Sequence, residues 1–393
     1  MRPLAITAYS LCSAAGDGQV ATLRALRERR SGLQRNDFGA TPLATWIGRV
    51  AGLEEQPLPQ HLAEWDCRNN RLAWRGLLAD GFGDAVAAAR ERYGSGRVAV
   101  VVGTSTSSIG ASEDAYRRLD PDGRYPSDLR RPIIHTPHSL GDFVQHALGL
   151  SGLSVTLATA CSSSAKVFAQ AERLIRTGIA DAAVVGGVDT LCGSVLFGFN
   201  SLELVSPEPC RPFDVERRGI NLGEAAGFAL LEREGPAPAW LLGYGESSDA
   251  HHMSTPHPEG RGARLALEAA LERAQLAPGD IDYINLHGTA SQKNDEVEAR
   301  LVAELFPAST FASSTKGWTG HALGAAGIVE AAISLLALEH GVLPGTLNSQ
   351  TLDPVCGPQI RRDNEERPTR NALSFSFGFG GSNCVLALGS RAQ

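Results

Sequence analysis

Continuous apolar runs alternate along the chain with segments whose apolar residues recur at helical spacing. The runs are closed by Gly or small polar residues, which is typical of strands buried inside a sheet. Such strands are predicted at 97–106, 154–160, 181–189 and 283–290, with a terminal hairpin that begins in 371–381 and ends with "CVLALG". The alternation of strands and helices predicts an α/β protein.

Two helical segments stand out between these runs. Residues 162–178, "SSSAKVFAQAERLIRTG", place Ala165, Phe168, Ala171, Leu174 and Ile175 on one face, and Gly178 is expected to end the helix. Residues 322–341, "ALGAAGIVEAAISLLALEHG", are apolar on nearly every face. That pattern favours a helix buried in the core over one that lies at the surface.

The length of the chain, 393 residues, predicts two domains or one duplicated unit. The segment "EREGPAPAW" at 232–240 is the best candidate boundary, so we expect halves at 1–235 and 236–393. Each half has strands that lead through small-residue turns into an apolar helix, which hints at an internal duplication.

Composition limits the classes of function. With 43% apolar and 20% charged residues, the chain is typical of globular proteins. A net charge of −7 argues against nucleic acid as the main partner. The seven cysteines show neither paired nor metal-ligand spacing, which suits a reducing compartment and predicts no metal. The apolar run near the N-terminus is too short to span a membrane, and we expect a cytoplasmic protein.

Cys161, in "ATACSSSAKVF", is the first candidate for chemistry. It falls between a predicted strand and the start of a helix, where unpaired N–H groups and the helix dipole are expected to lower the pKa of its thiol. The same turn offers backbone N–H groups to an oxyanion. The alternative is an inert core cysteine among small residues.

Two histidines and a lysine are further candidates. His287, in "NLHGTASQKND", follows a predicted strand, and His321, in "STKGWTGH", precedes the apolar helix. An apolar setting keeps an imidazole neutral, so that it donates one N–H and accepts at the other nitrogen. Lys316 is notable because the chain has only three lysines, and Lys is a compact charge that fits tight sites better than Arg. Structural roles for the histidines and a solvated loop position for Lys316 remain the alternatives.

Four motifs, "TACSSS", "HGTAS", "STKGWTGH" and "GFGGSN", occur in this order at large separations. With them the chain resembles the β-ketoacyl-acyl carrier protein synthases, the elongating condensing enzymes. The resemblance runs from "AITAYSLCSAAGDG" near the start to "SFGFGGSNCVLAL" near the end. It implies a thiolase-like fold of five layers, αβαβα, with two pseudo-duplicated halves.

The resemblance also implies an activity, namely decarboxylative condensation of an acyl-enzyme with a malonyl-acyl carrier protein. Cys161 matches the acyl-accepting nucleophile, His287 and His321 match the decarboxylation site, and Lys316 matches the motif lysine beside it. Asp295 and Glu330 match acidic positions that support the lysine and the helix. Phe379 matches the gating residue, whose N–H completes the oxyanion hole with that of Cys161. The resemblance implies no cofactor.

Departures from the family's usual pattern favour a polyketide or polyene pathway over bulk fatty-acid elongation. The chain reads "GINLGEAAG" at 219–227, and Trp318 stands where a smaller or flexible apolar residue is more usual. Thr106, in "GTSTSSIG", falls where the acyl tunnel is often gated. We assign no role to Lys166 or Lys293 from the sequence.

The resemblance implies an acidic acyl carrier protein as partner, loaded with acyl or malonyl groups, and a homodimer or a heterodimer with a related subunit. Because that partner is acidic, the entrance to the active site is expected to be basic. Candidate docking residues are Arg68, Arg71, Arg75, Arg130, Arg131 and Arg211. The first three share one helical face, and an ordinary solvated face is the alternative.

Two other functions are open. A non-catalytic or chain-length-determining partner subunit would share the fold, but such proteins typically lack the cysteine present here as Cys161. A degradative thiolase would use a second cysteine near the C-terminus, and Cys384 is late enough in the chain to be considered. Its position in a predicted strand favours the synthase.

Overall fold

The fold of the computed structural model is built on one eleven-stranded mixed sheet, and residues 1–391 are described. Strand β2 (Gly16–Asp17) pairs only with β1. One half of the sheet has the spatial order β6 (Ser154–Leu157), β5 (Val98–Gly103), β7 (Ala182–Asp189), β9 (Ala225–Glu232), β1 (Leu4–Ser13). The other half has the order β12 (Phe311–Ser313), β11 (Tyr283–Asn285), β15 (Asn371–Gly378), β16 (Ser382–Gly389), β10 (Ala239–Ser248).

The two halves repeat one topology. Strand β5 pairs in parallel with β6 and β7, as β11 does with β12 and β15. The fourth and fifth strands of each half are antiparallel. Strands β1 and β10 join the halves as an antiparallel pair, with Leu4 opposite Leu241 and Ile6 opposite Ala239. The expected duplication is therefore present in the strand order.

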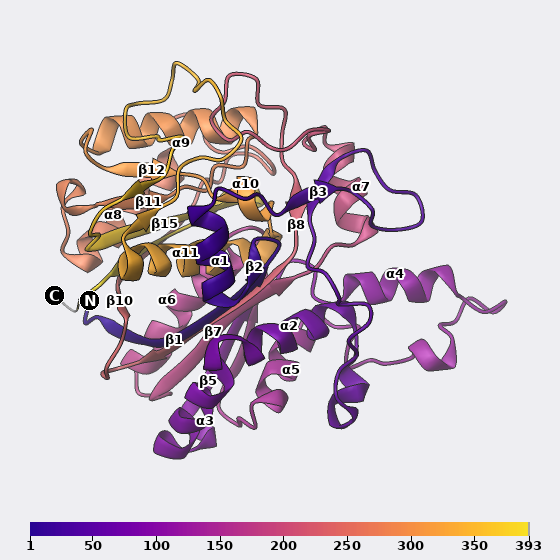
Figure 1. The fold of residues 1–393 in the computed structure, drawn as a ribbon. Helices are drawn as coiled ribbons and strands as arrows, with labels where there is room; N and C mark the ends of the chain where they lie inside the picture. Colours follow the sequence, from indigo (N-terminus) through magenta and orange to yellow (C-terminus); the bar gives the residue numbers. More distant parts are fainter. Residues whose placement is uncertain (392–393) are drawn as a thin grey trace.

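Helices form three layers around the two halves of the sheet (Figure 1). The outer face of the first half is covered by α2 (Arg68–Leu78), α3 (Phe82–Tyr93) and α5 (Ser139–Ala147). The outer face of the second half is covered by α8 (Arg261–Ala274) and α9 (Gln292–Leu305). Between the halves lie α6 (Ser163–Arg176) and α11 (Ala326–His340), which contact each other. The result is the expected five-layer αβαβα arrangement.

Shorter elements surround this core. They are α1 (Gly18–Arg27), α4 (Ile109–Arg117), α7 (Gly193–Ser201) and α10 (Lys316–Thr319), with the small strands β3 (Leu33–Arg35), β4 (Trp46–Gly48), β8 (Leu222–Gly223), β13 (Val342–Leu343) and β14 (Glu365–Glu366). Helix α4 and the loop after it project from one end of the molecule (Figure 1).

The apolar helix predicted at 322–341 is the central helix of the fold. A window from Leu323 to His340 is apolar enough to cross a membrane, with a mean hydropathy of 1.4, but 89% of it is buried inside the protein. Sheet and helix residues from both halves enclose α11 on all sides, which explains why its sequence lacks a polar face.

The predicted strand at 154–160 differs from expectation. Its ordered part, β6, is half-buried rather than fully buried, because it lies at the edge of the sheet and pairs with β5 on one side. A continuous apolar run does not distinguish an edge strand from a central one, since both faces of an edge strand can still pack on helices.

Gly103 fixes how closely β5 approaches the start of α6. A Cβ there would lie 2.5 Å from backbone atoms of Ser163 and Ser164. We predict that Gly103→Ala lowers the free energy of unfolding by about 1–3 kcal/mol, because backbone must move to accept the methyl group. Denaturant unfolding measures this change.

Gly198 in α7 is the matched control. No atom lies within 4 Å of a Cβ built there, so Gly198→Ala is expected to raise stability by about 0.5–1 kcal/mol through reduced backbone entropy of the unfolded chain. Equal effects of the two substitutions would contradict the close approach of β5 and α6.

Candidate active site

Cys161 lies in the tight turn between β6 and α6 and is buried. Side-chain hydroxyls hold the turn: the Thr159 N–H donates to Ser163 Oγ at 2.9 Å, and Ser163 Oγ donates to the Ala160 carbonyl at 2.6 Å. Ala160 takes a left-handed conformation with φ of 52°. These contacts direct the sulfur toward the space between the two halves of the sheet.

His321 reaches the same space from the second half. It lies between α10 and α11, and its backbone pairs with the segment around β8: its N–H donates to the Asn221 carbonyl at 2.7 Å, and its carbonyl accepts from the Gly223 N–H at 3.0 Å. Its Nε2 is 3.0 Å from Cys161 Sγ. The "GINLGEAAG" segment thus positions a histidine, a role that the sequence reasoning did not assign to it.

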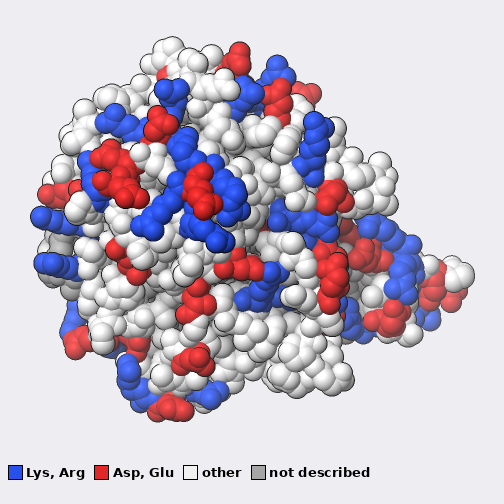
Figure 2. Space-filling model, viewed as in Figure 1, with Lys and Arg blue, Asp and Glu red and all other residues white. Residues whose placement is uncertain are grey.

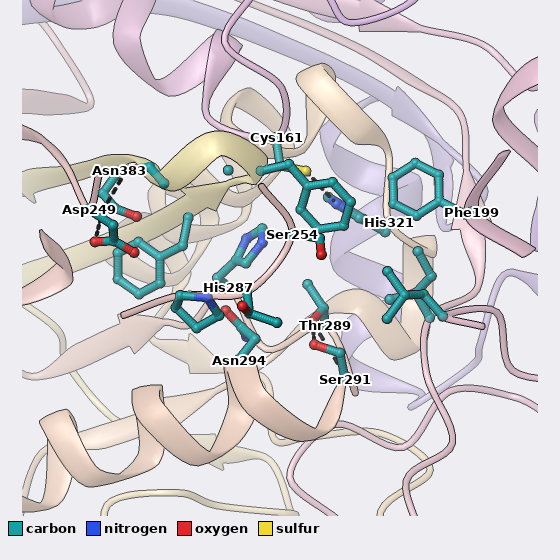
Figure 3. Close-up of a pocket in the computed structure, with 18 residues that line it drawn as sticks. Cys161, Phe199, Asp249, Ser254, His287, Thr289, Ser291, Asn294, His321 and Asn383 are labelled. Carbon is teal, nitrogen blue, oxygen red and sulfur yellow. Dashed lines mark hydrogen bonds between the residues drawn. The ribbon is translucent and has the colours of Figure 1, made fainter. Parts of the chain in front are cut away.

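His287 follows β11 and completes the group. Its ring centroid lies 5.4 Å from that of His321, with the two planes at 86°. The sulfur and the imidazole nitrogens of the three residues all lie within 4.8 Å of one another. The structure therefore brings together Cys161, His287 and His321, as expected from the sequence (Figure 3).

Glu298 holds the turn that carries His287, and the sequence reasoning missed it. Its carboxylate accepts the backbone N–H groups of His287 at 2.6 Å and Gly288 at 2.7 Å, and the Asn294 amide at 3.2 Å. Burial raises its pKa to about 8, while these donors oppose the shift. An acidic residue on the buried face of α9 was the available signal.

Lys316 does not contact either imidazole through its ammonium group. Its Nζ donates to the carbonyl of His287 and forms an ion pair with Glu330 of α11, and all three residues are buried. Burial raises the pKa of Glu330 to about 7, and the Lys316 ammonium opposes this. The pair therefore ties the His287 turn to the central helix.

Asp295 occupies a different network from Lys316. Its carboxylate accepts the Phe213 N–H at 2.7 Å and the Ala290 N–H at 3.2 Å, and it lies 3.9 Å from Arg217. It supports the backbone after His287 and does not touch the lysine. Of the two acidic residues expected to support Lys316, only Glu330 contacts it.

Burial controls the charge state of the three convergent residues. Desolvation, followed by the Lys316 charge, lowers the pKa of His287 and His321 well below the ordinary range. Desolvation raises the pKa of the Cys161 thiol to about 11, although Lys316 and the Phe379 N–H oppose this. The expectation that the helix N-terminus lowers the pKa was wrong, because the loss of water outweighs it. Both groups are therefore neutral, and a hydrogen bond joins the thiol and His321 Nε2.

Phe379 forms one wall of the pocket that opens at Cys161. Its backbone N–H donates to the sulfur, and its ring lies 5.4 Å from that of Phe199 at 33°. The pocket is narrow, with a cavity volume of about 50 Å³, and it is lined from both halves of the chain (Figure 3). A Cβ built on Gly378, the residue before Phe379, would lie 3.2 Å from the Ser162 nitrogen, so this turn approaches the start of α6 closely. The oxyanion hole formed by the Cys161 and Phe379 N–H groups remains a prediction.

Thr106 does not line this pocket. Its hydroxyl and its N–H both donate to the buried Asp189 carboxylate, at 2.6 and 2.8 Å, and the Thr104 hydroxyl donates to the same group at 2.6 Å. Asp189 thus organises the loop after β5. A role for Thr106 in acyl length remains a prediction.

The arginines predicted to dock a carrier protein are largely occupied by contacts within the chain. On α2, Arg68 pairs with Glu224 at 2.6 Å, Arg71 pairs with Asp66 at 2.6 Å, and Arg75 pairs with Asp17. Arg131 donates to the Asp66 carbonyl, Arg130 lies 3.7 Å from Asp120, and Arg211 contacts Glu208 and Glu216. Their docking role remains a prediction.

Cys161, His287 and His321 also form a donor set that Zn²⁺ accepts. Two such ligands on one tetrahedral zinc ion are separated by about 3.5 Å, given Zn–S and Zn–N bonds of about 2.3 and 2.0 Å. The 3.0 Å between Sγ and Nε2 fits a thiol–imidazole hydrogen bond better. These residues could hold zinc only after the sulfur and the ring move apart.

Cys384 lies on β16 with its side chain in the central core, and it does not line the Cys161 pocket. Desolvation raises the pKa of its thiol. A second cysteine that serves as a base, as the thiolase alternative requires, is therefore not provided by Cys384.

Comparisons with known proteins place the chain in a family. Residues 71–237 match the N-terminal domain of β-ketoacyl synthases, and residues 239–350 match their C-terminal domain. A mitochondrial 3-oxoacyl-[acyl-carrier-protein] synthase of Arabidopsis thaliana is 40% identical over 264 residues, which are 62% of this chain and 57% of that protein. Nodulation protein E of Rhizobium meliloti (strain 1021) is 35% identical over 306 residues, 74% of this chain and 75% of that protein.

Solved structures agree over nearly the full length. A ketosynthase (ApeO) in complex with its chain length factor (ApeC), from Xenorhabdus doucetiae, has a TM-score of 0.89 and 36% identity, and the match covers 99% of this chain and 98% of that one. The ishigamide ketosynthase/chain length factor has a TM-score of 0.90 and 26% identity, with 99% of each chain covered. The thiolase-like fold is thereby confirmed, and the chain belongs to the β-ketoacyl synthase family of condensing acyltransferases.

Proposed function

We propose that this chain condenses an acyl group carried on Cys161 with a malonyl group on an acyl carrier protein, in a polyketide- or polyene-type pathway. The observation that carries the proposal is the 3.0 Å contact between Cys161 Sγ and His321 Nε2, with the His287 ring edge-on beside it in one buried pocket. The similarity to ketosynthases that act with chain length factors supports the choice of pathway.

In the first half-reaction the sulfur attacks the thioester of an acyl carrier. The thiol proton passes to His321 Nε2, the S–C bond to Cys161 forms, and the carrier leaves as a thiol that takes the proton back. Negative charge on the carbonyl oxygen is stabilised by the N–H groups of Cys161 and Phe379.

In the second half-reaction the malonyl group loses CO₂, and its electron pair moves into an enolate. Neutral His287 offers an N–H to the enolate oxygen, and neutral His321 does the same in the tautomer that carries the proton on Nε2, which avoids a buried cation in the resting site. The enolate carbon then attacks the acyl-enzyme, the bond to sulfur breaks, and the Cys161 thiol is regenerated with a proton from solvent.

The proposed catalytic roles divide between the two halves of the chain. We propose that residues 1–235 and 236–393 are the two structural halves, the first carrying Cys161 and the second carrying both histidines and Lys316. The two matched family domains, which meet between residues 237 and 239, support this division.

We propose that the partner is a loaded acyl carrier protein and that the chain works as a dimer. The solved relatives that pair a ketosynthase with its chain length factor favour a related second subunit. We also propose a cytoplasmic location. All seven cysteines are free, which suits a reducing compartment.

Cys161→Ala is expected to abolish formation of the acyl-enzyme, because Cys161 supplies the one thiol among the residues that line the pocket. Intact-protein mass spectrometry after incubation with acyl carrier protein measures the mass added. Cys384→Ala serves as the control and should acylate normally. Acylation that survives in Cys161→Ala would show that the nucleophile is assigned wrongly.

His287→Ala is expected to slow malonyl decarboxylation by about 10²- to 10³-fold, the usual effect of removing one oxyanion donor. Acylation of Cys161 should stay near the wild-type rate, because His321 and not His287 contacts the sulfur. His321→Ala should impair both half-reactions. Release of CO₂ and acyl-enzyme formation are measured separately, and equal losses in His287→Ala would contradict these roles.

Lys316→Ala is expected to destabilise the protein by about 3–5 kcal/mol, because it leaves the Glu330 carboxylate buried without its partner. In the double variant Lys316→Met/Glu330→Gln no buried charge is left unpaired, and most of the stability should return. Decarboxylation should stay low in both, because neither holds the His287 carbonyl. Thermal unfolding and CO₂ release distinguish the two effects, and full activity in the double variant would refute the tie to His287.

A further inference from the structure

The Glu224 carboxylate is buried beside the segment that carries His321. Glu224 directly follows β8. Its Oε1 accepts the Val50 N–H at 2.9 Å, and its Oε2 accepts the Leu191 N–H at 3.1 Å. Val50 comes just after β4 and Leu191 comes just after β7, so one carboxylate joins the ends of three strands, β4, β7 and β8.

Arg68, the first residue of α2, supplies the opposite charge. Its Nε donates to Oε2 of Glu224 at 3.0 Å, and its Nη2 donates to Oε1 at 2.6 Å. Its remaining nitrogen, Nη1, pairs with Glu54. All three guanidinium nitrogens of Arg68 are thus engaged within the chain. Two parallel N–H bonds fix the orientation of the carboxylate as well as neutralising its charge.

This pair differs from the ion pairs at the surface. On the face shown in Figure 2, basic and acidic side chains are interspersed, and exposed pairs of this kind contribute little to stability. The side chain of Arg68 is 18% exposed and that of Glu224 is 0% exposed. A pair removed from water needs accurate geometry to offset its desolvation. Its contacts are therefore expected to hold the neighbouring backbone in one position.

Strand β8 connects this carboxylate to His321. Its residues Leu222 and Gly223 pair in parallel with Ile47 and Gly48 of β4. The backbone of His321 forms a second parallel bridge with Leu222. Strand β8 therefore lies between β4 and His321, and a displacement of β8 would move the imidazole.

The backbone on both sides of His321 is also packed closely. A Cβ built on Gly223 would lie 2.1 Å from the carbonyl oxygen of Thr319, so β8 approaches the turn before His321 without space for a side chain. Leu323, just after His321, belongs to the same buried apolar cluster as Leu191. The segments that pack around His321 are therefore the ones that the buried carboxylate joins.

We infer that Arg68 and Glu224 are positioning residues, which hold β8 so that His321 Nε2 stays within reach of the Cys161 sulfur. This inference rests on the proposed function, in which His321 takes the proton of the thiol. Neither Arg68 nor Glu224 lines the Cys161 pocket, so the pair acts through the backbone. A misplacement of about 1 Å can slow a reaction about 10²-fold, so a small shift of β8 is sufficient to matter.

The test is alkylation of Cys161 by iodoacetamide, which needs no carrier protein. The sulfur forms a bond to the reagent's carbon, iodide leaves, and the thiol proton passes to His321. Glu224→Gln is expected to slow this alkylation about tenfold, because a displaced imidazole accepts the proton less readily. In a His321→Ala background the same substitution should have no further effect, since the group that it positions is absent. Mass spectrometry of the peptide that contains Cys161 measures the rate.

Glu232→Gln is the matched control. Glu232 is also a buried carboxylate, paired with Arg92 at 2.9 Å, but it ends β9, whereas Glu224 immediately precedes that strand. The length of the strand separates the two carboxylates by about 26 Å. Glu232→Gln should lower the thermal unfolding temperature and leave alkylation of Cys161 at the wild-type rate. It thus separates a loss of stability from a displacement of the imidazole.

Arg68→Gln distinguishes positioning from carrier docking, the role predicted for Arg68 from the sequence. A positioning residue lowers kcat for malonyl decarboxylation and slows the alkylation, with KM for the carrier-bound substrate nearly unchanged. A docking residue raises KM and leaves both rates intact. Because Arg68 is partly exposed, Arg68→Gln also carries the alkylation test if Glu224→Gln does not fold.

Slower alkylation in Glu224→Gln and Arg68→Gln, but not in Glu232→Gln, would support the inference. A rate at or above wild type in the first two variants, an equal loss in Glu232→Gln, or a further loss in the His321→Ala background would each overturn it. If wild-type protein takes up no acyl group from a carrier, the proposed function fails. The alkylation rates do not depend on that outcome, so the two failures are distinguishable.

Discussion

The close contact between the N-terminal ends of α6 and α11 is the constraint on which the rest of the structure depends. A Cβ on Gly327 would lie 2.6 Å from the Ala165 nitrogen, and the Ile328 N–H donates to Ser164 Oγ at 2.9 Å. Each helix follows the outermost parallel strand of its half, so the repeated topology brings the turns before them together. Cys161 precedes one helix and His321 precedes the other, and their 3.0 Å contact is a consequence of this packing.

Burial gives the site its chemical character. Because the helices are enclosed by two halves of a sheet, water is excluded from the sulfur and from both imidazoles. The pKa of each histidine falls and that of the thiol rises, so the resting site holds neutral groups joined by a hydrogen bond. Neutral N–H donors are suited to an enolate oxygen, which is charged only while the reaction proceeds.

The buried ion pair of Lys316 with Glu330 influences both imidazoles without contacting them. Its charge contributes to keeping the imidazoles unprotonated, and its contact with the His287 carbonyl fixes the turn that Glu298 holds from the other side. The three lysines stand in different settings: Lys316 fits a buried space, whereas Lys293 is exposed on α9 beside Glu296. The third, Lys166, lies 3.9 Å from Glu246 and joins α6 to β10.

The sequence by itself determined the strands, the amphipathic α6 and the all-apolar α11, because each of these depends on a local pattern of apolar residues. It also gave the candidates Cys161, His287, His321 and Lys316, because each lies in a short motif that can be read from neighbouring residues. Only the tertiary structure decided what requires long-range contact. It showed that Glu298 holds the backbone of His287 and that Asn221 and Gly223 hold the backbone of His321. It also showed that Asp295 lies beside Arg217 and not Lys316, and that the arginines predicted to dock a carrier protein contact groups within the chain. The tertiary structure also decided the direction in which the pKa of Cys161 is shifted. A helix end is visible in the sequence, but the amount of water removed from a sulfur depends on everything that packs around it.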